Sequence, residues 1–186
     1  NTNQMLSEAI KLISSKPRVI CASGISFYAE SDCNDPKAED DPQGEGYLTD
    51  LSIAVENAAK SISDDVTILR FGVVLSRNGG ALGKLYWPYY FGFGGPIMNG
   101  NQCFSWIHID DLVNAILFLI EETTAKGIFN LTAPELGTNT IFGQALGKSI
   151  KRPALIPVPG FVLKLALGEA ATLALDGQRA VSDKLQ

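Results

Sequence analysis

The residues best placed to do chemistry lie in one short stretch of the chain, Ser105-Trp106-Ile107-His108-Ile109-Asp110-Asp111. His108 is the only histidine, and an imidazole exchanges a proton near neutral pH more readily than other side chains. The spacing allows two interpretations. Either His108 is a structural histidine fixed by Asp110 or Asp111, or it is a general acid–base that faces a ligand crevice. In the second case Trp106 and Asp111 lie on the substrate side of that crevice.

A second candidate is Tyr28, which follows the apolar stretch Val19–Ala22. That stretch predicts a short buried strand ending at Ser23 and Gly24. A phenol beside a positive charge can act as an acid–base group, but no Lys or Arg close to Tyr28 is evident from the sequence. Tyr28 is therefore either catalytic or a buried tyrosine whose hydroxyl is hydrogen-bonded.

Strands and helices must alternate to position these groups, and the apolar pattern predicts that they do. The nearly continuous apolar run Val66–Leu75 is typical of one parallel strand covered on both faces. Asp110 stands at the expected N-cap of a following helix. Between 79 and 100 the chain is rich in glycine and aromatic residues, which either line an apolar substrate pocket or pack between two subdomains. The expected strands cover residues 19–22, 66–75, 105–109 and 127–131, and the expected helices cover 2–14, 48–60, 112–120, 139–150 and 160–175.

This alternation predicts an α/β fold with a parallel sheet, whose ligands bind beyond the carboxyl ends of the strands. The chain opens on a helix, without the strand and Gly-rich turn that usually begin such a sheet. We therefore expect a segment, or an assembly partner, to be missing before Asn1.

Composition narrows the classes of partner. The 186 residues carry a net charge of −5, with no basic patch for nucleic acid. No stretch reaches the roughly 18 uncharged apolar residues of a membrane span. Three widely spaced cysteines and one histidine predict neither a metal site nor a disulfide framework, which fits an intracellular, reducing compartment. The acidic loop 30–46 is expected to be solvated rather than to bind metal.

Several stretches, in this order, resemble one known family: Ser23–Ala29 (SGISFYA), Leu69–Gly83 (LRFGVVLSRNGGALG), Gly92–Pro96 (GFGGP), the SWIHIDD block at 105–111, Asn130–Pro134 (NLTAP), Arg152-Pro153, Gly168-Glu169 and Gly177-Gln178-Arg179. The family is the epimerase family branch of the atypical extended short-chain dehydrogenases, known as the SDR39U/YfcH branch. The resemblance covers nearly the whole chain.

The resemblance implies a Rossmann-like parallel sheet, of which this chain holds the C-terminal half, and a smaller α/β substrate subdomain. Residues 1–78 would be the latter part of the NAD(P)-binding domain, and residues 79–186 mainly the substrate-binding subdomain, with 103–131 returning in part to the sheet. The implied cofactor is NADP(H), and the substrate is an unknown small molecule. The implied contacts with the cofactor are Ser23, Gly24, Gly72 and Val74. The family's Gly-rich phosphate loop has no match here.

The chain departs at the catalytic pair from the pattern of working short-chain dehydrogenases, and the resemblance implies that the branch generally replaces this pair as well. Working short-chain dehydrogenases carry Tyr-x-x-x-Lys on a helix, whereas this chain has Ser52 and Glu56 at those positions, with no positive charge evident nearby. The resemblance therefore implies an epimerase/dehydratase-like oxidoreductase with other acid–base groups, for which Tyr28 and His108 are the candidates. The alternative is a non-catalytic nucleotide-binding sensor, or an accessory subunit of a larger assembly. The expected location is the cytoplasm or an organelle such as a mitochondrion or plastid.

Overall fold

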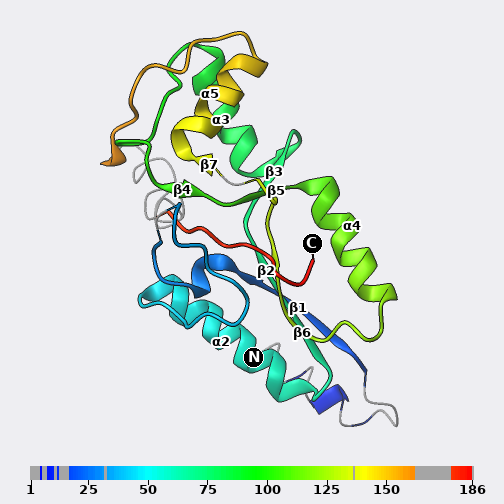
Figure 1. Ribbon diagram of the computed structural model, residues 1–186. Helices are drawn as coiled ribbons and strands as arrows, with labels where there is room; N and C mark the ends of the chain where they lie inside the picture. The colour runs from blue at the N-terminus through cyan, green and yellow to red at the C-terminus, as the bar shows by residue number, and fades with distance from the viewer. Residues whose placement is uncertain are drawn as a thin grey trace.

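The computed structural model describes residues 5, 8–10, 12, 17–31, 33–135, 137–161 and 177–185. Its centre is a parallel sheet of β1 (Val19–Gly24), β2 (Val66–Phe71) and β6 (Gly127–Leu131), in the order β1-β2-β6. The predicted α/β fold with a parallel sheet is confirmed (Figure 1). Most of the helices expected over 2–14 and 160–175 falls outside the described residues.

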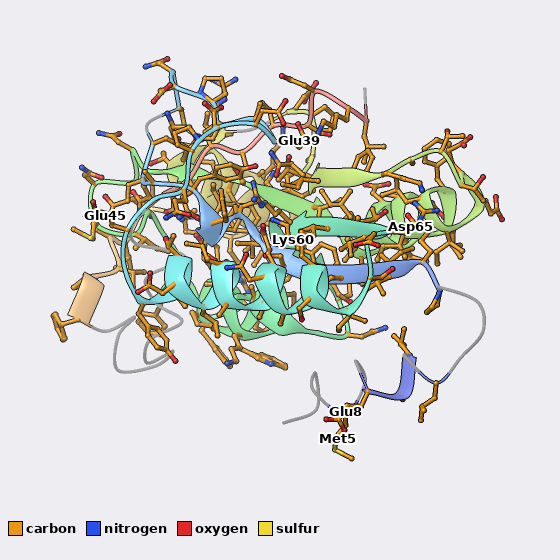
Figure 2. The ribbon with its side chains drawn as sticks, turned by 90° about the horizontal axis from the view of Figure 1, so that it is seen from below. Met5, Glu8, Glu39, Glu45, Lys60 and Asp65 are labelled. Atoms are coloured by element: carbon orange, nitrogen blue, oxygen red, sulfur yellow. A yellow bond between two sulfur atoms is a disulfide. The ribbon has the colours of Figure 1, made fainter. Side chains whose placement is uncertain are left out.

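Helices cover both faces of this sheet, as the apolar pattern of its strands requires. On one face α4 (Ile109–Glu121) packs Leu112 and Leu119 against Leu69 of β2 and Phe129 of β6. On the other face lies α2 (Tyr47–Ile62), which Figure 2 shows running along the sheet. Because neighbouring residues of a strand point to opposite faces, Leu69 enters the α4 core while the next side chain, Arg70, faces α2.

The apolar run Val66–Leu75 was expected to be one strand, and this expectation is wrong. Gly72 interrupts it: β2 ends at Phe71, and β3 (Val73–Ser76) joins a separate parallel pair with β5 (Trp106–His108). The backbone N–H of Gly72 still donates to Leu131 in the first sheet, at 3.0 Å, but that of Val73 donates to Ser105, at 2.9 Å. The chain thus changes hydrogen-bonding partners within one residue, and a crevice opens where the two sheets part.

A second group of elements lies beyond this crevice (Figure 1). It contains α3 (Gly80–Tyr90) and α5 (Asn139–Ser149), with the antiparallel pair β4 (Cys103–Phe104) and β7 (Gly137–Thr138). The hydroxyl of the buried Tyr89 in α3 donates to the carbonyl oxygen of Gly95 at 3.0 Å. The division into two domains at residue 78 stays a prediction.

The last described segment, residues 177–185, runs back across the molecule, and we call it the C-terminal strap. It carries the isolated parallel bridges Lys37–Ala180 and Phe104–Gln178, so it lies between the loop that follows β1 and strand β4. Among the residues that the structure describes, no helix is both long and apolar enough to cross a membrane.

Candidate functional site

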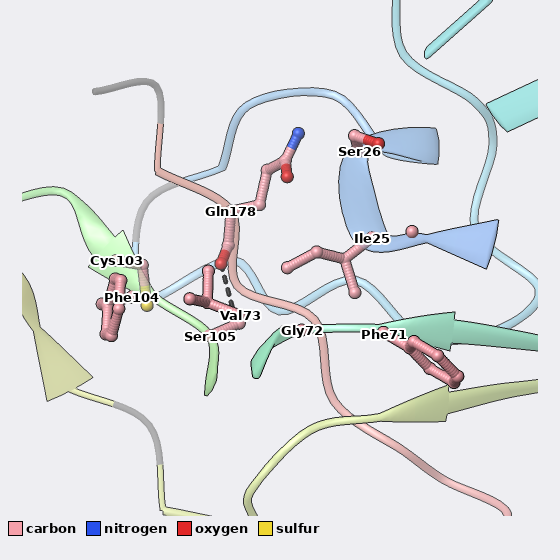
Figure 3. A pocket seen from close by; sticks show the side chains of 10 residues that line it. Ile25, Ser26, Phe71, Gly72, Val73, Cys103, Phe104, Ser105 and Gln178 are labelled. Carbon is pink, nitrogen blue, oxygen red and sulfur yellow. Dashed lines mark hydrogen bonds between the residues drawn. The ribbon is translucent and has the colours of Figure 1, made fainter. Parts of the chain in front are cut away.

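A cavity of about 120 Å³ lies where β1 and β2 end and the second group of elements begins (Figure 3). Gly24, Ile25 and Ser26 form one side; the last two belong to the short 3₁₀ helix η1 (Ile25–Phe27). The other lining residues are Phe71, Gly72 and Val73 at the sheet division, Cys103, Phe104 and Ser105 from β4 and the turn after it, and Gln178 of the C-terminal strap. This is the predicted position for a ligand, beyond the carboxyl ends of parallel strands.

The cavity is small for a complete dinucleotide. Its volume is enough for several water molecules, which suits one ring of a ligand. Gly72 keeps the wall thin: a Cβ there would lie 3.0 Å from the carbonyl oxygen of Ser105 and 3.1 Å from Cγ2 of Thr132. A side chain at this position would therefore crowd the backbone that frames the cavity.

The predicted cofactor contacts divide into two groups. Gly24 and Gly72 line the cavity. Ser23 directly precedes Gly24, but its Oγ donates to Glu56 Oε1 at 3.0 Å, away from the cavity. Val74 follows the lining residue Val73 and packs, half-buried, against the α4 core. Contacts between these four residues and a cofactor stay a prediction.

A polar network is buried between α2 and the sheet, behind the cavity. Arg70 donates from Nε to Glu56 Oε1 at 2.8 Å and from Nη2 to Oε2 at 2.9 Å, and the two side chains are only 1% and 2% exposed. Arg70 Nη1 also donates to the hydroxyl of Tyr28 at 2.8 Å, which in turn donates to Asn130 Oδ1 at 2.9 Å. Every charge in this network is therefore paired and hydrogen-bonded, as buried charges must be.

This network corrects two expectations. A Lys or Arg close to Tyr28 was not evident from the sequence, and neither was a positive charge close to Glu56, yet Arg70 contacts both. It does so from the neighbouring strand, 42 residues after Tyr28 in the chain. Tyr28 is 1% exposed and hydrogen-bonded, as the structural interpretation requires, and it does not line the cavity. Burial raises the pKa of Tyr28 above its ordinary value, although the adjacent Arg70 opposes the shift.

Ser52, which the resemblance places at the position of the catalytic tyrosine of working short-chain dehydrogenases, does not line the cavity but contacts a hydroxyl that does. Its Oγ lies 2.9 Å from Oγ of Ser26, which lines the cavity. Because Ser52 has one hydroxyl proton and donates it to the carbonyl oxygen of Leu48 at 3.0 Å, Ser26 is the donor between the two serines. Ser26 therefore offers the cavity an acceptor and no free proton in this arrangement.

His108 occupies a helix N-terminus. It is the N-cap of α4, and its Nδ1 accepts a hydrogen bond from the backbone N–H of Asp110 at 3.2 Å. The expectation that Asp110 is the N-cap is therefore wrong: the N-cap lies two residues earlier, and the helix begins at Ile109. His108 is 44% exposed, and neither it nor the half-buried Trp106 nor the exposed Asp111 lines the cavity.

The acidic loop is less solvated than expected, because Glu39 is 3% exposed. Its Oε1 accepts from the backbone N–H of Asn130 at 3.0 Å and from Ser182 Oγ at 2.8 Å, and its Oε2 accepts from the N–H of Asp183 at 3.1 Å. This carboxylate fastens the C-terminal strap to the sheet. The composition of a loop does not indicate which of its carboxylates is buried, so this role of Glu39 could not be predicted.

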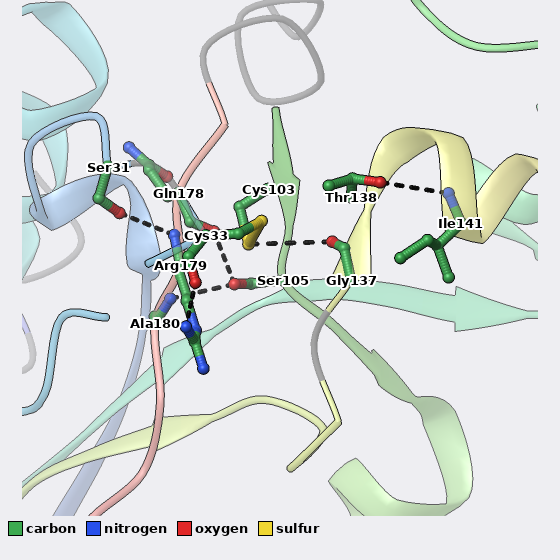
Figure 4. Close-up of a disulfide and its surroundings, with 10 residues drawn as sticks. All are labelled: Ser31, Cys33, Cys103, Ser105, Gly137, Thr138, Ile141, Gln178, Arg179 and Ala180. Carbon is green, nitrogen blue, oxygen red and sulfur yellow. Dashed lines mark hydrogen bonds between the residues drawn. A yellow bond between two sulfur atoms is a disulfide. The ribbon is translucent and has the colours of Figure 1, made fainter. Parts of the chain in front are cut away.

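The prediction that no disulfide is present is also wrong. Cys33 and Cys103 form one, with their Cα atoms 5.1 Å apart, and leave Cys21 as the free cysteine (Figure 4). The two cysteines are 70 residues apart in the chain, so counting and spacing alone did not pair them. The fold brings them together beside the cavity, which Cys103 lines.

A second, more open cavity of about 430 Å³ lies between α2 and the acidic loop. Its lining carries four acidic residues, Glu39, Asp40, Asp41 and Glu56, against the two basic residues Lys60 and Arg70, so its net charge disfavours phosphate groups. Within the described part of the chain, no group of three or more His, Cys, Asp or Glu side chains could hold a metal ion.

Sequence reasoning missed three polar residues of this region: Ser26, Arg70 and Gln178. Arg70 had a detectable signal, because it is the only charged residue in the apolar run 66–75 and a buried charge requires a buried partner. Ser26 and Gln178 had none, since their roles depend on a turn and on the path of the C-terminal strap.

Comparison with known proteins agrees with this fold. Residues 158–186 match the family model described as a domain of unknown function, DUF1731. The chloroplastic homologue of the epimerase family protein SDR39U1 from Arabidopsis thaliana is 36% identical, over 96% of this chain and 53% of that protein. The crystal structure of human SDR39U1 with NADPH superposes with a TM-score of 0.88 at 34% identity, over 97% of this chain and 62% of that one.

A more distant structure is a nucleoside-diphosphate sugar epimerase from Corynebacterium glutamicum, with a TM-score of 0.76 at 26% identity, over 96% of this chain and 35% of that one. The chain spans less than two thirds of each of these proteins. Identity above 30% to both SDR39U1 proteins extends over nearly all of its residues. The chain therefore belongs to the SDR39U1 epimerase family of extended short-chain dehydrogenases.

Proposed function

We propose that this chain forms part of an NADP(H)-binding, epimerase/dehydratase-like oxidoreductase. The nicotinamide end of the cofactor occupies the cavity between Gly24 and Gly72. The observation that carries the proposal is the position of that cavity, at the carboxyl ends of β1 and β2. Its size suits a single ring. The human relative, described as bound to NADPH, supports the choice of cofactor.

In this proposal the backbone at Gly24 and Gly72 lies against the nicotinamide, with Ser23 and Val74 beside it. Ser26 would accept a hydrogen bond from the ligand, because its own proton is given to Ser52. NADP(H) would supply a hydride acceptor or donor. The substrate would approach from the side of Trp106 and Asp111, and the reaction would be redox chemistry or epimerisation at a carbon that bears a hydroxyl.

Acid–base roles for Tyr28 and His108 belong to the same proposal. In Tyr28 the acid–base group would be the hydroxyl, which hydrogen bonds with Arg70 and Asn130 hold in place. His108 would act from the start of α4, where its Nδ1 is engaged by Asp110. The intracellular location, in the cytoplasm or an organelle, is also part of the proposal, and the chloroplastic name of the Arabidopsis relative supports an organelle.

A specific observation favours the alternative, a nucleotide-binding sensor or accessory subunit without turnover. Neither residue at the Tyr-x-x-x-Lys positions is free for proton transfer: Ser52 donates to a backbone carbonyl, and Glu56 is held in the ion pair with Arg70. A protein of this kind would bind the cofactor and leave it unchanged.

The test uses the whole protein and the fluorescence of reduced nicotinamide. Titration with NADPH and NADH gives the two affinities, and we expect NADPH to bind more tightly. Gly24→Leu fills the cavity and should weaken NADPH binding by about tenfold or more. Gly83→Leu is the matched control, because a Cβ at Gly83 meets nothing within 4 Å. Equal affinities of the two variants for NADPH would place the ring elsewhere.

Turnover separates the two candidate functions. NADPH oxidation is followed with a panel of carbonyl compounds, and epimerisation with nucleoside-diphosphate sugars, the class named for the Corynebacterium neighbour. Consumption of NADPH or isomerised sugar identifies an enzyme. Binding of NADPH without either reaction identifies a sensor.

A further inference from the structure

The C-terminal strap is held between two segments that lie far apart in the chain. On one side is the loop after β1: the N–H of Arg179 donates to Ser31 Oγ at 2.9 Å, and the N–H of Lys37 donates to the carbonyl oxygen of Arg179 at 2.7 Å. On the other side is Ser105, whose Oγ donates to the carbonyl oxygen of Gln178 at 2.6 Å and accepts from the N–H of Ala180 at 3.0 Å.

The disulfide joins these same two segments. Cys33 lies in the loop between Ser31 and Lys37, and Cys103 lies in β4, two residues before Ser105. Figure 4 shows the strap passing between the two segments beside the sulfur atoms. The covalent bond therefore fixes the separation of the two segments that hold the strap.

The clasped strap is also a wall of the ligand cavity. Cys103, Ser105 and Gln178 all line that cavity. If the bond opens, the loop that carries Cys33 loses its covalent link to β4, while the strap's hydrogen bonds to both segments remain. The strap can then exchange its backbone bonds with water, and the cavity loses a fixed side.

We propose that the Cys33–Cys103 pair is a thiol–disulfide exchange site, which clasps the C-terminal strap onto the cavity when oxidised and releases it when reduced by a dithiol. In the intracellular location proposed above, disulfides are usually transient or redox-sensing. Cys33 is half-buried and Cys103 is 3% exposed, so the sulfur open to attack is that of Cys33.

A thiolate of the dithiol attacks Sγ of Cys33, the bond to Cys103 breaks, and Cys103 leaves as a thiolate that takes up a proton. The second thiol of the reductant, as its thiolate, then attacks the mixed disulfide at the reductant's own sulfur. Cys33 is released as a thiol, and the reductant leaves as its disulfide. The protein gains two electrons, and the reverse reaction forms the Cys33–Cys103 disulfide again.

The first measurement is a thiol count in mixtures of reduced and oxidised dithiothreitol. Alkylation after denaturation should label one cysteine per chain at the oxidising end, Cys21, and all three at the reducing end. Three labelled cysteines in every mixture would mean that the bond does not form, which overturns the proposal.

The second measurement is hydrogen exchange of peptides covering residues 177–185 in the oxidised and reduced protein. Reduction should accelerate exchange of the Arg179, Ala180 and Val181 amides by about tenfold. Cys33→Ser should resemble the reduced protein, and Cys21→Ser should still respond like the unchanged protein. Unchanged exchange on reduction would overturn the clasp, and this comparison needs no variant to fold.

An effect on the ligand rests on the function proposed above. With NADPH as the probe, reduction should weaken binding severalfold. If hydrogen exchange changes but the affinity for NADPH does not, the disulfide holds the strap without affecting the cavity. The proposed effect of the disulfide on the cavity is then wrong. If NADPH binds neither form, the proposed function fails while the exchange result still decides the clasp.

Discussion

Glu56 and Arg70 meet between α2 and β2 in a two-point ion pair, with Nε–Oε1 and Nη2–Oε2 distances of 2.8 Å and 2.9 Å. Both side chains are almost completely buried. The guanidinium also binds the Tyr28 hydroxyl, so one cation organises the interior next to the cavity. The helix position that carries Lys in working dehydrogenases here carries a carboxylate, and the positive charge comes from the strand instead.

Removing one partner of this pair should be strongly destabilising. Glu56→Gln leaves Arg70 charged in the interior, and the free energy of unfolding should fall by about 3–5 kcal/mol. Urea unfolding measures the change. Glu56→Gln combined with Arg70→Met should cost clearly less than the two single variants added together. Lys126→Gln is the control, because the side chains of its pair with Asp65 are 57% and 34% exposed, far more than those of Glu56 and Arg70, and the pair should contribute about 1 kcal/mol or less. A loss for Glu56→Gln as small as that of Lys126→Gln would contradict the prediction.

Tyr28 should make the protein sensitive to alkaline pH. Its pKa is raised by burial in the folded state, so this tyrosine favours the folded state fully below its unfolded pKa of about 10. That contribution is lost as the pH rises from about 10 through the folded pKa. In unfolding experiments at pH 9 to 11, Tyr28→Phe should show a smaller loss of stability with pH than the unchanged protein. Tyr47→Phe is the control, because Tyr47 is exposed. If Tyr28→Phe leaves the dependence of stability on pH unchanged, other groups cause that dependence.

His108 should contribute to stability as a cap. His108→Ala removes the acceptor for the Asp110 N–H and should lower the free energy of unfolding by about 1 kcal/mol. His108→Asn supplies another side-chain acceptor and should restore most of the loss. NADPH affinity and turnover are measured on both variants. A loss of ligand binding or activity that persists in His108→Asn would support the predicted acid–base role. If neither variant loses binding or activity, capping of α4 is the role of His108.

Two glycines should respond to alanine with opposite signs. Gly72→Ala places a Cβ 3.0 Å from the Ser105 carbonyl oxygen, which already accepts from Val73. The crowded backbone should cost about 1–3 kcal/mol of stability. Gly83→Ala adds a Cβ that meets nothing within 4 Å. Because alanine has a higher helix propensity than glycine, this change inside α3 should stabilise the protein by up to about 1 kcal/mol. Thermal unfolding of the two variants decides the prediction, which fails if Gly72→Ala melts no lower than the unchanged protein.

The sequence predicted best those elements whose apolar pattern is local. The strand over 127–131 corresponds to β6, and the helix over 139–150 nearly matches α5. The division at Gly72 escaped prediction because its cause is remote: Leu131 and Ser105 offer carbonyl groups from two different sheets. A nearly continuous apolar run carries no information about which partner each residue will pair with.

The candidate site was predicted in part. The ends of the first two strands were expected to face a ligand, and Gly24 and Gly72 do line the cavity there. Arg70 was missed because its partners are set by the register of β1 against β2, which places Ser23 opposite it. The disulfide was missed for a similar reason, since proximity across 70 residues is a property of the fold.

The strap also has a consequence for the order of folding. The contact between Arg179 and Ser31 joins residues 148 positions apart, and such non-local contacts form late because a long loop must first close. During synthesis, Glu39 and Asn130 emerge long before the strap residues that bind them, Ser182 and Val181. Until then the cavity has an open side and its polar groups bind water. The side of the cavity that Gln178 lines therefore closes only after residues 177–185 have emerged, later than the sheet that frames the rest of the cavity.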